Sequence, residues 1–207
     1  MKLTLKYAAV IFAFASSAAS ATVLNSRVNV DDSFVAYIST SDTVAGTAFS
    51  SGNQWDLTAV GSTVLTAGQD YYLHIMATDL GAMAGLLGEF WLDETAHVFA
   101  NGAQNLLTNS VDWQGNNTGF DGSYVELGDY GFNGSDPWYY RDGVSTDAKW
   151  IWSGHNEWND IAFFSTKITA TTATPVEVPE PASWALFGLG LLGVAGAKRC
   201  RNKHTNA

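Results

Sequence analysis

The sequence predicts an all-β fold, a β-sandwich or a barrel, and three observations support this class. Between Thr22 and about Ile168 there is no long helical period. Short runs rich in Val, Ile, Thr and aromatic residues recur there, and clusters of Gly, Asn and Asp separate them, as strands and turns require. Hydrophobic residues make up 46% of the 207, enough to bury a core. We expect about eight strands in one domain, a number that fits a sandwich or a barrel.

The first predicted strand, 33–40, alternates with a period of two, so that Phe34, Ala36 and Ile38 share one face. The runs 54–60 and 62–66 follow, and Gly61 between them predicts a hairpin. In the run 70–78 the odd-numbered positions 71–77 form the apolar face. The glycines of 79–88 favour a loop and a strand entry over a short helix. The later predicted strands are 86–92, 123–127, 149–152 and 161–168.

The first 21 residues have the order of a secretory signal peptide. Lys2 and Lys6 precede the apolar run 7–15, and Ala19-Ser20-Ala21 supplies the small residues of a cleavage site. We therefore expect export and cleavage before Thr22, which leaves a β-domain over 22–168.

The other end reads as a linker followed by a membrane anchor. Residues 169–178 are rich in Thr, Ala and Pro, without a hydrophobic period. Pro179-Glu180-Pro181 comes next, then an uncharged apolar run, 182–197, and then Lys198, Arg199, Arg201 and Lys203. As a helix, this run spans roughly 24 Å, close to the shortest length that crosses a bilayer. The cations after it predict a single transmembrane helix with its basic end in the cytoplasm and the β-domain outside.

This tail, over 178–203, resembles the PEP-CTERM sorting signal in its Pro-Glu-Pro tripeptide, apolar run and basic end. The resemblance implies recognition by an exosortase, transient anchoring in the inner membrane, removal of the anchor, and delivery to the cell surface or extracellular matrix of a Gram-negative bacterium. An ordinary anchor that is never cut is the alternative. Within the domain, 71–92 and 149–168 are similar to strands of galactose-binding-like jelly-roll domains, which implies an antiparallel jelly-roll sandwich.

The charge distribution excludes one class of partner. All twenty acidic residues lie between Asp31 and Glu180. The stretch from Arg27 to Glu180 contains only four cations, Arg27, Arg141, Lys149 and Lys167, and therefore has a formal charge of −16. Such a surface repels a phosphate backbone, so we expect no nucleic-acid partner. The single cysteine, Cys200, follows the apolar run, so the β-domain contains no disulfide.

Aromatic side chains beside amides and carboxylates suggest glycan binding, because ring faces stack on sugars and polar groups bind their hydroxyls. Trp91, Trp150 and Trp152 lie in strand-like runs and are assigned to the core, whereas three other Trp lie in loop-like stretches. The alternative for these is a lid over the core edge or a polar surface loop. The candidate ligand-binding residues are Trp113, Asn116, Asn117, Asp121, Trp138, Tyr139, Tyr140, Arg141 and Trp158.

A structural Ca²⁺ ion is a further possibility, with ligands from Asn116, Asn117 and Asp121 or from Asp31 and Asp32, although no EF-hand spacing is present. The four histidines are scattered and form no zinc motif.

No nucleophile elbow or phosphate-binding loop accompanies the acids, so we expect a non-enzymatic protein. Two alternatives to a glycan binder stay open. One is a structural matrix protein held together by divalent cations without a pocket. The other is a glycoside hydrolase, for which a catalytic carboxylate pair would come from Glu89, Asp93, Glu94, Glu126 and Glu157.

Overall fold

The computed structural model describes residues 21–171, which form twelve β-strands joined by loops, without a helix in that range. The predicted all-β class is confirmed. The strands are β1 (Thr22–Asp31), β2 (Ser33–Ser39), β3 (Thr47–Gly52), β4 (Ala59–Leu65), β5 (Tyr71–Thr78), β6 (Gly85–Leu92), β7 (His97–Phe99), β8 (Asn105–Leu107), β9 (Gln114–Asn116), β10 (Leu127–Phe132), β11 (Lys149–Ser153) and β12 (Ile161–Ala170).

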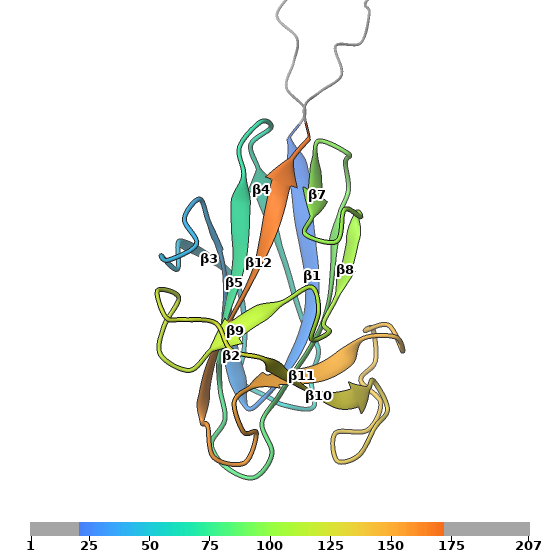
Figure 1. The fold of residues 1–207 in the computed structure, drawn as a ribbon. Coiled ribbons are helices and arrows are strands. Elements are labelled where there is room, and N and C mark those ends of the chain that lie inside the picture. The colour runs from blue at the N-terminus through green and yellow to red at the C-terminus, as the bar shows by residue number, and fades with distance from the viewer. Residues whose placement is uncertain (1–20, 172–207) are drawn as a thin grey trace, which may run out of the picture. The chain divides into compact units, whose positions relative to one another are not determined.

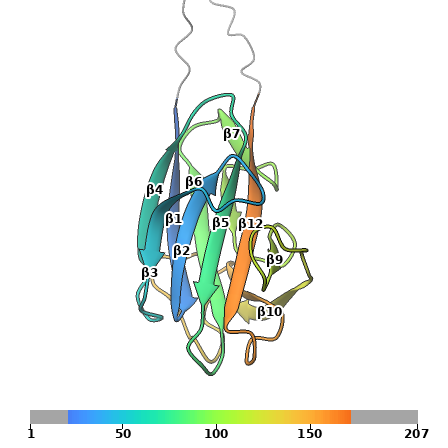
Figure 2. The same cartoon turned by 90° about the vertical axis from the view of Figure 1, so that its left-hand side faces the viewer.

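Two antiparallel sheets of six strands each face one another, and Figure 2 shows the two layers edge-on. The first sheet has the order β10-β11-β6-β1-β4, with β8 also paired to β6. The second has the order β3-β2-β5-β12-β7, with β9 also paired to β12. This arrangement is the predicted β-sandwich. Two facing antiparallel sheets are also what the jelly-roll resemblance implies.

Five of the strands that contribute to the main core were located from the sequence. The strands β2, β5, β6, β11 and β12 match the predicted ranges within two residues at each end. The predicted hairpin over 54–66 is wrong, because Gly61 lies inside β4 and pairs with Ser26 of β1. The predicted strand 123–127 is also wrong: only Val125 forms an isolated bridge, to Gly115, and β10 begins at Leu127.

The main core lies between the sheets. Phe34, Ala36 and Ile38 of β2 and the inward side chains of β5 are buried there against β1, β6 and β12. The residues 79–84 form the predicted loop before the entry of β6.

Loops cover the outer face of each sheet at one place. The loop after β10 buries Trp138, Val144 and Ala148 against Leu87 and Trp150 on the outer face of the first sheet. On the second sheet, Phe120 from the loop after β9 packs its ring on those of Tyr37, His74 and Phe163, with centroid separations of 6.0, 4.4 and 5.1 Å. Parts of both sheets are therefore buried on two faces.

The chain enters β1 and leaves β12 at the same end of the sandwich (Figure 1), where His97 Nδ1 lies 2.9 Å from Thr22 Oγ1. β12 runs through Ala170, two residues into the predicted linker. The predicted signal peptide up to residue 20, residues 172–178 of the predicted linker and the predicted apolar helix 182–197 lie outside the described residues. Within 21–171 no helix has the length and apolar character needed to cross a membrane.

Candidate functional site

Three connections converge at the end of the sandwich opposite to the chain's entry and exit (Figure 1). They are the turn at Asp32 between β1 and β2, the loop 79–84 between β5 and β6, and the loop 154–160 between β11 and β12. The Asp79 N–H donates to the Asp160 carbonyl at 2.8 Å, and the Ala84 N–H donates to the Asn156 carbonyl at 2.8 Å. We call this region the loop end.

The loop end gathers three carboxylates. Asp31 ends β1, Asp32 forms the turn, and Asp79 follows β5. One oxygen from each lies within 4.8 Å of the others. The fold creates this proximity because β2 and β5 pair with Ser33 opposite Thr78, and the Asp32 N–H donates to the Thr78 carbonyl at 2.8 Å. Carboxylate oxygens at this spacing are potential ligands for a hard cation.

Burial and the charges of neighbouring carboxylates disfavour the ionised forms of Asp31 and Asp79. Desolvation raises the pKa of Asp31 to about 6, with a smaller upward contribution from the charge of Asp32, while the hydrogen bond from Trp138 opposes the shift. Desolvation also raises the pKa of Asp79, and the charges of Asp32 and Asp160 act in the same direction. In the described part of the chain, the ion pairs engage Asp70 and Asp129, not these three acids.

The same end presents a rigid exposed indole. Trp158 is 76% exposed, and its ring lies parallel to that of His155 with centroids 4.1 Å apart and planes 9° apart. The turn that carries both is fixed by N–H groups of Trp158 and Asn159 that donate to the His155 carbonyl at 3.2 and 3.0 Å. One face of the indole is therefore held against an imidazole at a defined position.

Two of the other predicted stacking residues are not available for stacking. Trp113 is 2% exposed, lies in the main core and donates through Nε1 to the Leu107 carbonyl at 3.2 Å. Trp138 is also 2% exposed; its ring stacks on Trp150 at 4.6 Å and Nε1 donates to Asp31 at 3.0 Å. The expectation that these indole faces lie in water is wrong, because the loops that carry them fold back over apolar side chains.

The predicted amides serve the fold. Asn116 is buried, and its Oδ1 accepts from the N–H groups of Thr118 and Gly119, which closes the turn after β9. Asn117 Nδ2 donates to the carbonyls of Ser153 and Ile161 at 2.9 and 2.7 Å and so ties this loop to β11 and β12. Asp121 is exposed in the same loop.

The remaining candidates lie on the loop after β10. Tyr139 and Tyr140 are exposed, whereas Arg141 is buried, donates to the Trp138 carbonyl and places its guanidinium over Trp55 at 4.6 Å. Figure 1 shows the loops after β9 and β10 on opposite sides of the sandwich. The predicted residues therefore do not form one site.

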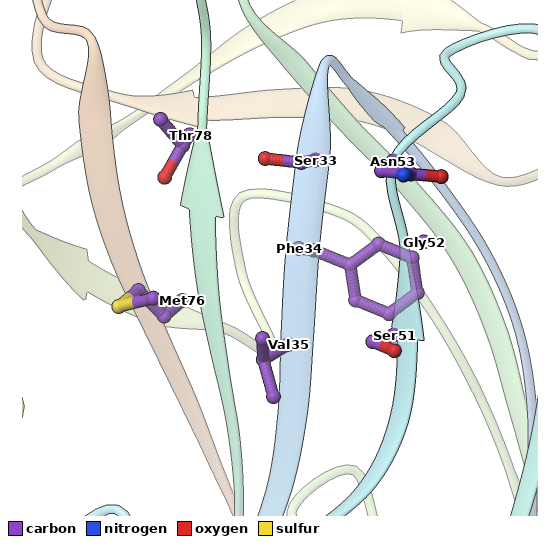
Figure 3. Close-up of a pocket in the computed structure, with 8 residues that line it drawn as sticks. All are labelled: Ser33, Phe34, Val35, Ser51, Gly52, Asn53, Met76 and Thr78. Atoms are coloured by element: carbon purple, nitrogen blue, oxygen red, sulfur yellow. The ribbon is translucent and has the colours of Figure 1, made fainter.

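A shallow depression of about 380 Å³ lies on the second sheet beside the loop end (Figure 3). Its lining carries hydroxyl, amide and apolar side chains and no ionisable group. Ser33 and Thr78, at one edge, are the sequence neighbours of Asp32 and Asp79. The lining residues are Ser33, Phe34, Val35, Ser51, Gly52, Asn53, Met76 and Thr78.

Sequence reasoning did not identify Asp79 as a potential ligand or His155 as the support of Trp158. The signal available for Asp79 was its position at a strand end. Asp79 directly follows the predicted strand 70–78, and Asp31 and Asp32 directly precede the predicted strand 33–40. For His155, the signal was its spacing of three residues from Trp158 in an Asn-rich stretch, since a turn there can bring the two rings together.

A family model for the PEP-CTERM protein-sorting motif matches residues 177–199. No curated protein and no solved structure matches the chain. The match contains Pro179-Glu180-Pro181 and the whole apolar run, so the resemblance predicted from these residues is confirmed. The chain is an exported surface protein that carries a PEP-CTERM sorting motif, is transiently anchored in the membrane and is sorted by an exosortase.

Proposed function

We propose that the exported β-domain is a non-enzymatic module of the cell surface or extracellular matrix that binds polysaccharide at Trp158. The observation that carries the proposal is an indole that is largely exposed and stacked on His155. A single face of this ring remains for a ligand. Aromatic rings provide a large contact area and few rotatable bonds, so stacking on a sugar ring is the interaction that such a side chain favours.

The turn around Trp158 is already ordered. The His155 N–H donates to Asn159 Oδ1 at 2.7 Å, and the Asn159 carbonyl accepts from Trp152 Nε1 of the core at 2.9 Å. Gly154 has a φ of +73°, a conformation that glycine adopts without strain. Binding at a fixed platform avoids the entropy cost of ordering a loop.

The surroundings of the platform favour a neutral, hydroxyl-rich ligand. Glu157 and Asp160 lie within two residues of Trp158 in the sequence and are exposed, so they can accept hydrogen bonds from sugar hydroxyls. The strongly acidic composition between residues 31 and 180 opposes anionic polymers. We therefore assign neutral polysaccharides, rather than uronate-rich or phosphorylated ones, as the ligand class.

The test is retention of the full-length protein, purified in mild detergent, on a panel of neutral and anionic polysaccharides. We expect binding to neutral members and a loss of about tenfold in affinity for Trp158→Ala, equivalent to about 1.4 kcal/mol. Tyr139→Ala, which removes an exposed ring from another loop, is the matched control and should bind like the parent protein. Equal binding by Trp158→Ala, or no binding by the parent to any neutral polysaccharide, would refute the proposal.

The hydrolase alternative is tested on the same panel by the release of reducing ends. We expect none above the blank, because the proposal assigns binding without turnover. Release that depends on a carboxylate of the domain would replace the proposed function with an enzymatic one.

A structural matrix role stabilised by divalent cations is the second candidate function, and the carboxylate cluster of the loop end favours it. The polysaccharide retention test separates the two functions, because the structural role does not require polysaccharide binding that depends on Trp158.

A further inference from the structure

We propose that Asp31, Asp32 and Asp79 bind one divalent cation, Ca²⁺ by their ligand chemistry, at the loop end. This inference does not rest on polysaccharide binding. It rests on the spacing of the three carboxylates and on one oxygen atom that the protein leaves without a partner.

The unpartnered oxygen belongs to Asp79. This residue is 3% exposed, and its Oδ1 is buried without a hydrogen-bond partner among the described residues. Its other oxygen, Oδ2, accepts from the Gly81 N–H at 3.1 Å. A buried carboxylate oxygen without a donor is strongly unfavourable, and native proteins supply a partner from protein, water or an ion.

The neighbouring carboxylates are oriented but not neutralised. Asp32 Oδ2 accepts from the Leu80 N–H at 2.7 Å, and Asp31 Oδ2 accepts from Trp138 Nε1 at 3.0 Å. Each of the three carboxylates thus has one oxygen fixed by a neutral donor. No Lys or Arg of the described residues forms an ion pair with any of them. A bound cation would supply the missing positive charge.

The ligand set selects a hard cation. All three side-chain donors are oxygens, which suit Ca²⁺, Mg²⁺ or Mn²⁺ rather than Zn²⁺ or Cu²⁺. Ca²⁺ binds oxygens at about 2.3–2.6 Å, so two ligands on opposite sides of the ion lie about 4.6–5.2 Å apart. The observed separations, at most 4.8 Å, allow one Ca²⁺ ion to contact all three carboxylates. Mg²⁺ binds at about 2.0–2.1 Å and requires a stricter octahedron.

The raised pKa values of Asp31 and Asp79 agree with this geometry, since they report carboxylates buried together without a counter-charge.

Terbium luminescence offers a direct test because Trp138 lies next to the cluster. Tb³⁺ substitutes for Ca²⁺ and emits when a nearby excited indole transfers energy to it. In the full-length protein in mild detergent, we expect saturable emission with one Tb³⁺ per chain that added Ca²⁺ displaces and Mg²⁺ displaces poorly. Absence of sensitised emission together with no heat of Ca²⁺ binding by calorimetry would overturn the proposal.

Variants locate the ion. Loss of a residue that only hydrogen-bonds to a metal ligand typically weakens metal binding by about 10- to 100-fold. Asp79→Asn and Asp32→Asn change the ligands themselves, so each should weaken Ca²⁺ binding by at least about 100-fold. Asp121→Asn, which removes an exposed acid from another loop, should bind like the parent. Unchanged binding in both cluster variants would place the ion elsewhere and overturn the proposal.

Thermal unfolding of the same variants covers the case in which a variant binds no ion because it folds poorly. In EDTA, Asp79→Asn should unfold at or above the parent's temperature, since it removes a buried charge. In Ca²⁺ the parent should unfold at the higher temperature. If the unfolding temperature of the parent is the same in Ca²⁺ and in EDTA, and the order of the two proteins does not reverse, the result would also count against the site.

Discussion

Replacing Trp138 by alanine should strongly destabilise the β-domain, although the residue lies in a loop whose sequence resembles a binding loop. The indole is almost fully buried, stacks on Trp150 and fills the second core on the outer face of the first sheet. Truncation of a buried Trp or Phe to Ala costs about 3–5 kcal/mol. For a domain of this size 1 kcal/mol shifts the unfolding temperature by about 2–4 °C, so we expect a decrease of about 10 °C.

Thermal and urea unfolding, followed by circular dichroism, measures this effect. Trp138→Phe keeps most of the ring but loses the Nε1 donor to Asp31, so its cost should be smaller than that of alanine. Tyr139→Ala, the exposed neighbour, should change stability by no more than about 0.5 kcal/mol. A loss below about 1 kcal/mol for Trp138→Ala would show that the loop does not form a second core, because surface truncations have costs of that size.

Two further predictions concern the covered outer faces of the sheets. Gly85→Ala should destabilise the domain by about 1–3 kcal/mol, measured by urea unfolding, because a Cβ there would lie 2.8 Å from atoms of both Trp138 and Trp150; unchanged stability would contradict the close packing of these rings over β6. Burial lowers the pKa of His74, so the unfolded chain binds this proton more tightly than the folded one. Stability should therefore fall as the pH decreases below about 6.5, by up to about 1.4 kcal/mol per pH unit. The difference between the unfolding free energies of the parent and His74→Gln, followed from pH 7 downward, isolates this contribution, and a difference that is constant with pH would refute it.

Two strands of the main core, β2 and β5, could be predicted because their alternation is regular. β2 and β5 place apolar side chains at every second position, and both were located within two residues. β1 was missed because Thr22 and Ser26 occupy inward positions while Val23 points outward, which disrupts the period. Ser26 is tolerated inside because Gly61 opposes it, and its hydroxyl donates to the Gly61 carbonyl at 3.3 Å.

The roles of Trp113 and Trp138 could not be predicted from their local sequence, since Gly, Asn and Asp also surround exposed turns. For Trp138, a signal was nevertheless present in the strands that it covers. Leu86 and Leu87 in β6, and the run 150–152 in β11, are apolar at consecutive positions. Consecutive apolar residues in a strand indicate burial on both faces. Some segment had to cover the outer face, and a tryptophan-bearing loop was the available one.

The carboxylate cluster lay beyond sequence reasoning for another reason. Alternation assigns each residue to a face of a strand but does not identify the strand with which it pairs. Only the register of β2 against β5, with Ser33 opposite Thr78, brings the turn at Asp32 to the end of β5. Asp31 and Asp32 were possible ligands from the start; Asp79 joins them through a pairing between segments more than forty residues apart.

The cluster and the Trp158 platform share the loop end, yet their energetic coupling should be weak. They are joined through the hydrogen bond from the Asp79 N–H to the Asp160 carbonyl, two residues after Trp158. A ligand shifts the affinity of another site only if it favours one of two states that both sites experience. This hydrogen bond lies at the end of the β5–β12 strand pair, where Thr78 is opposite Ile161. The pairing continues along the whole length of β5 and keeps the bond in place. Because neither ligand needs that pair to open or close, ion binding stabilises the loop end without being a condition for stacking at Trp158.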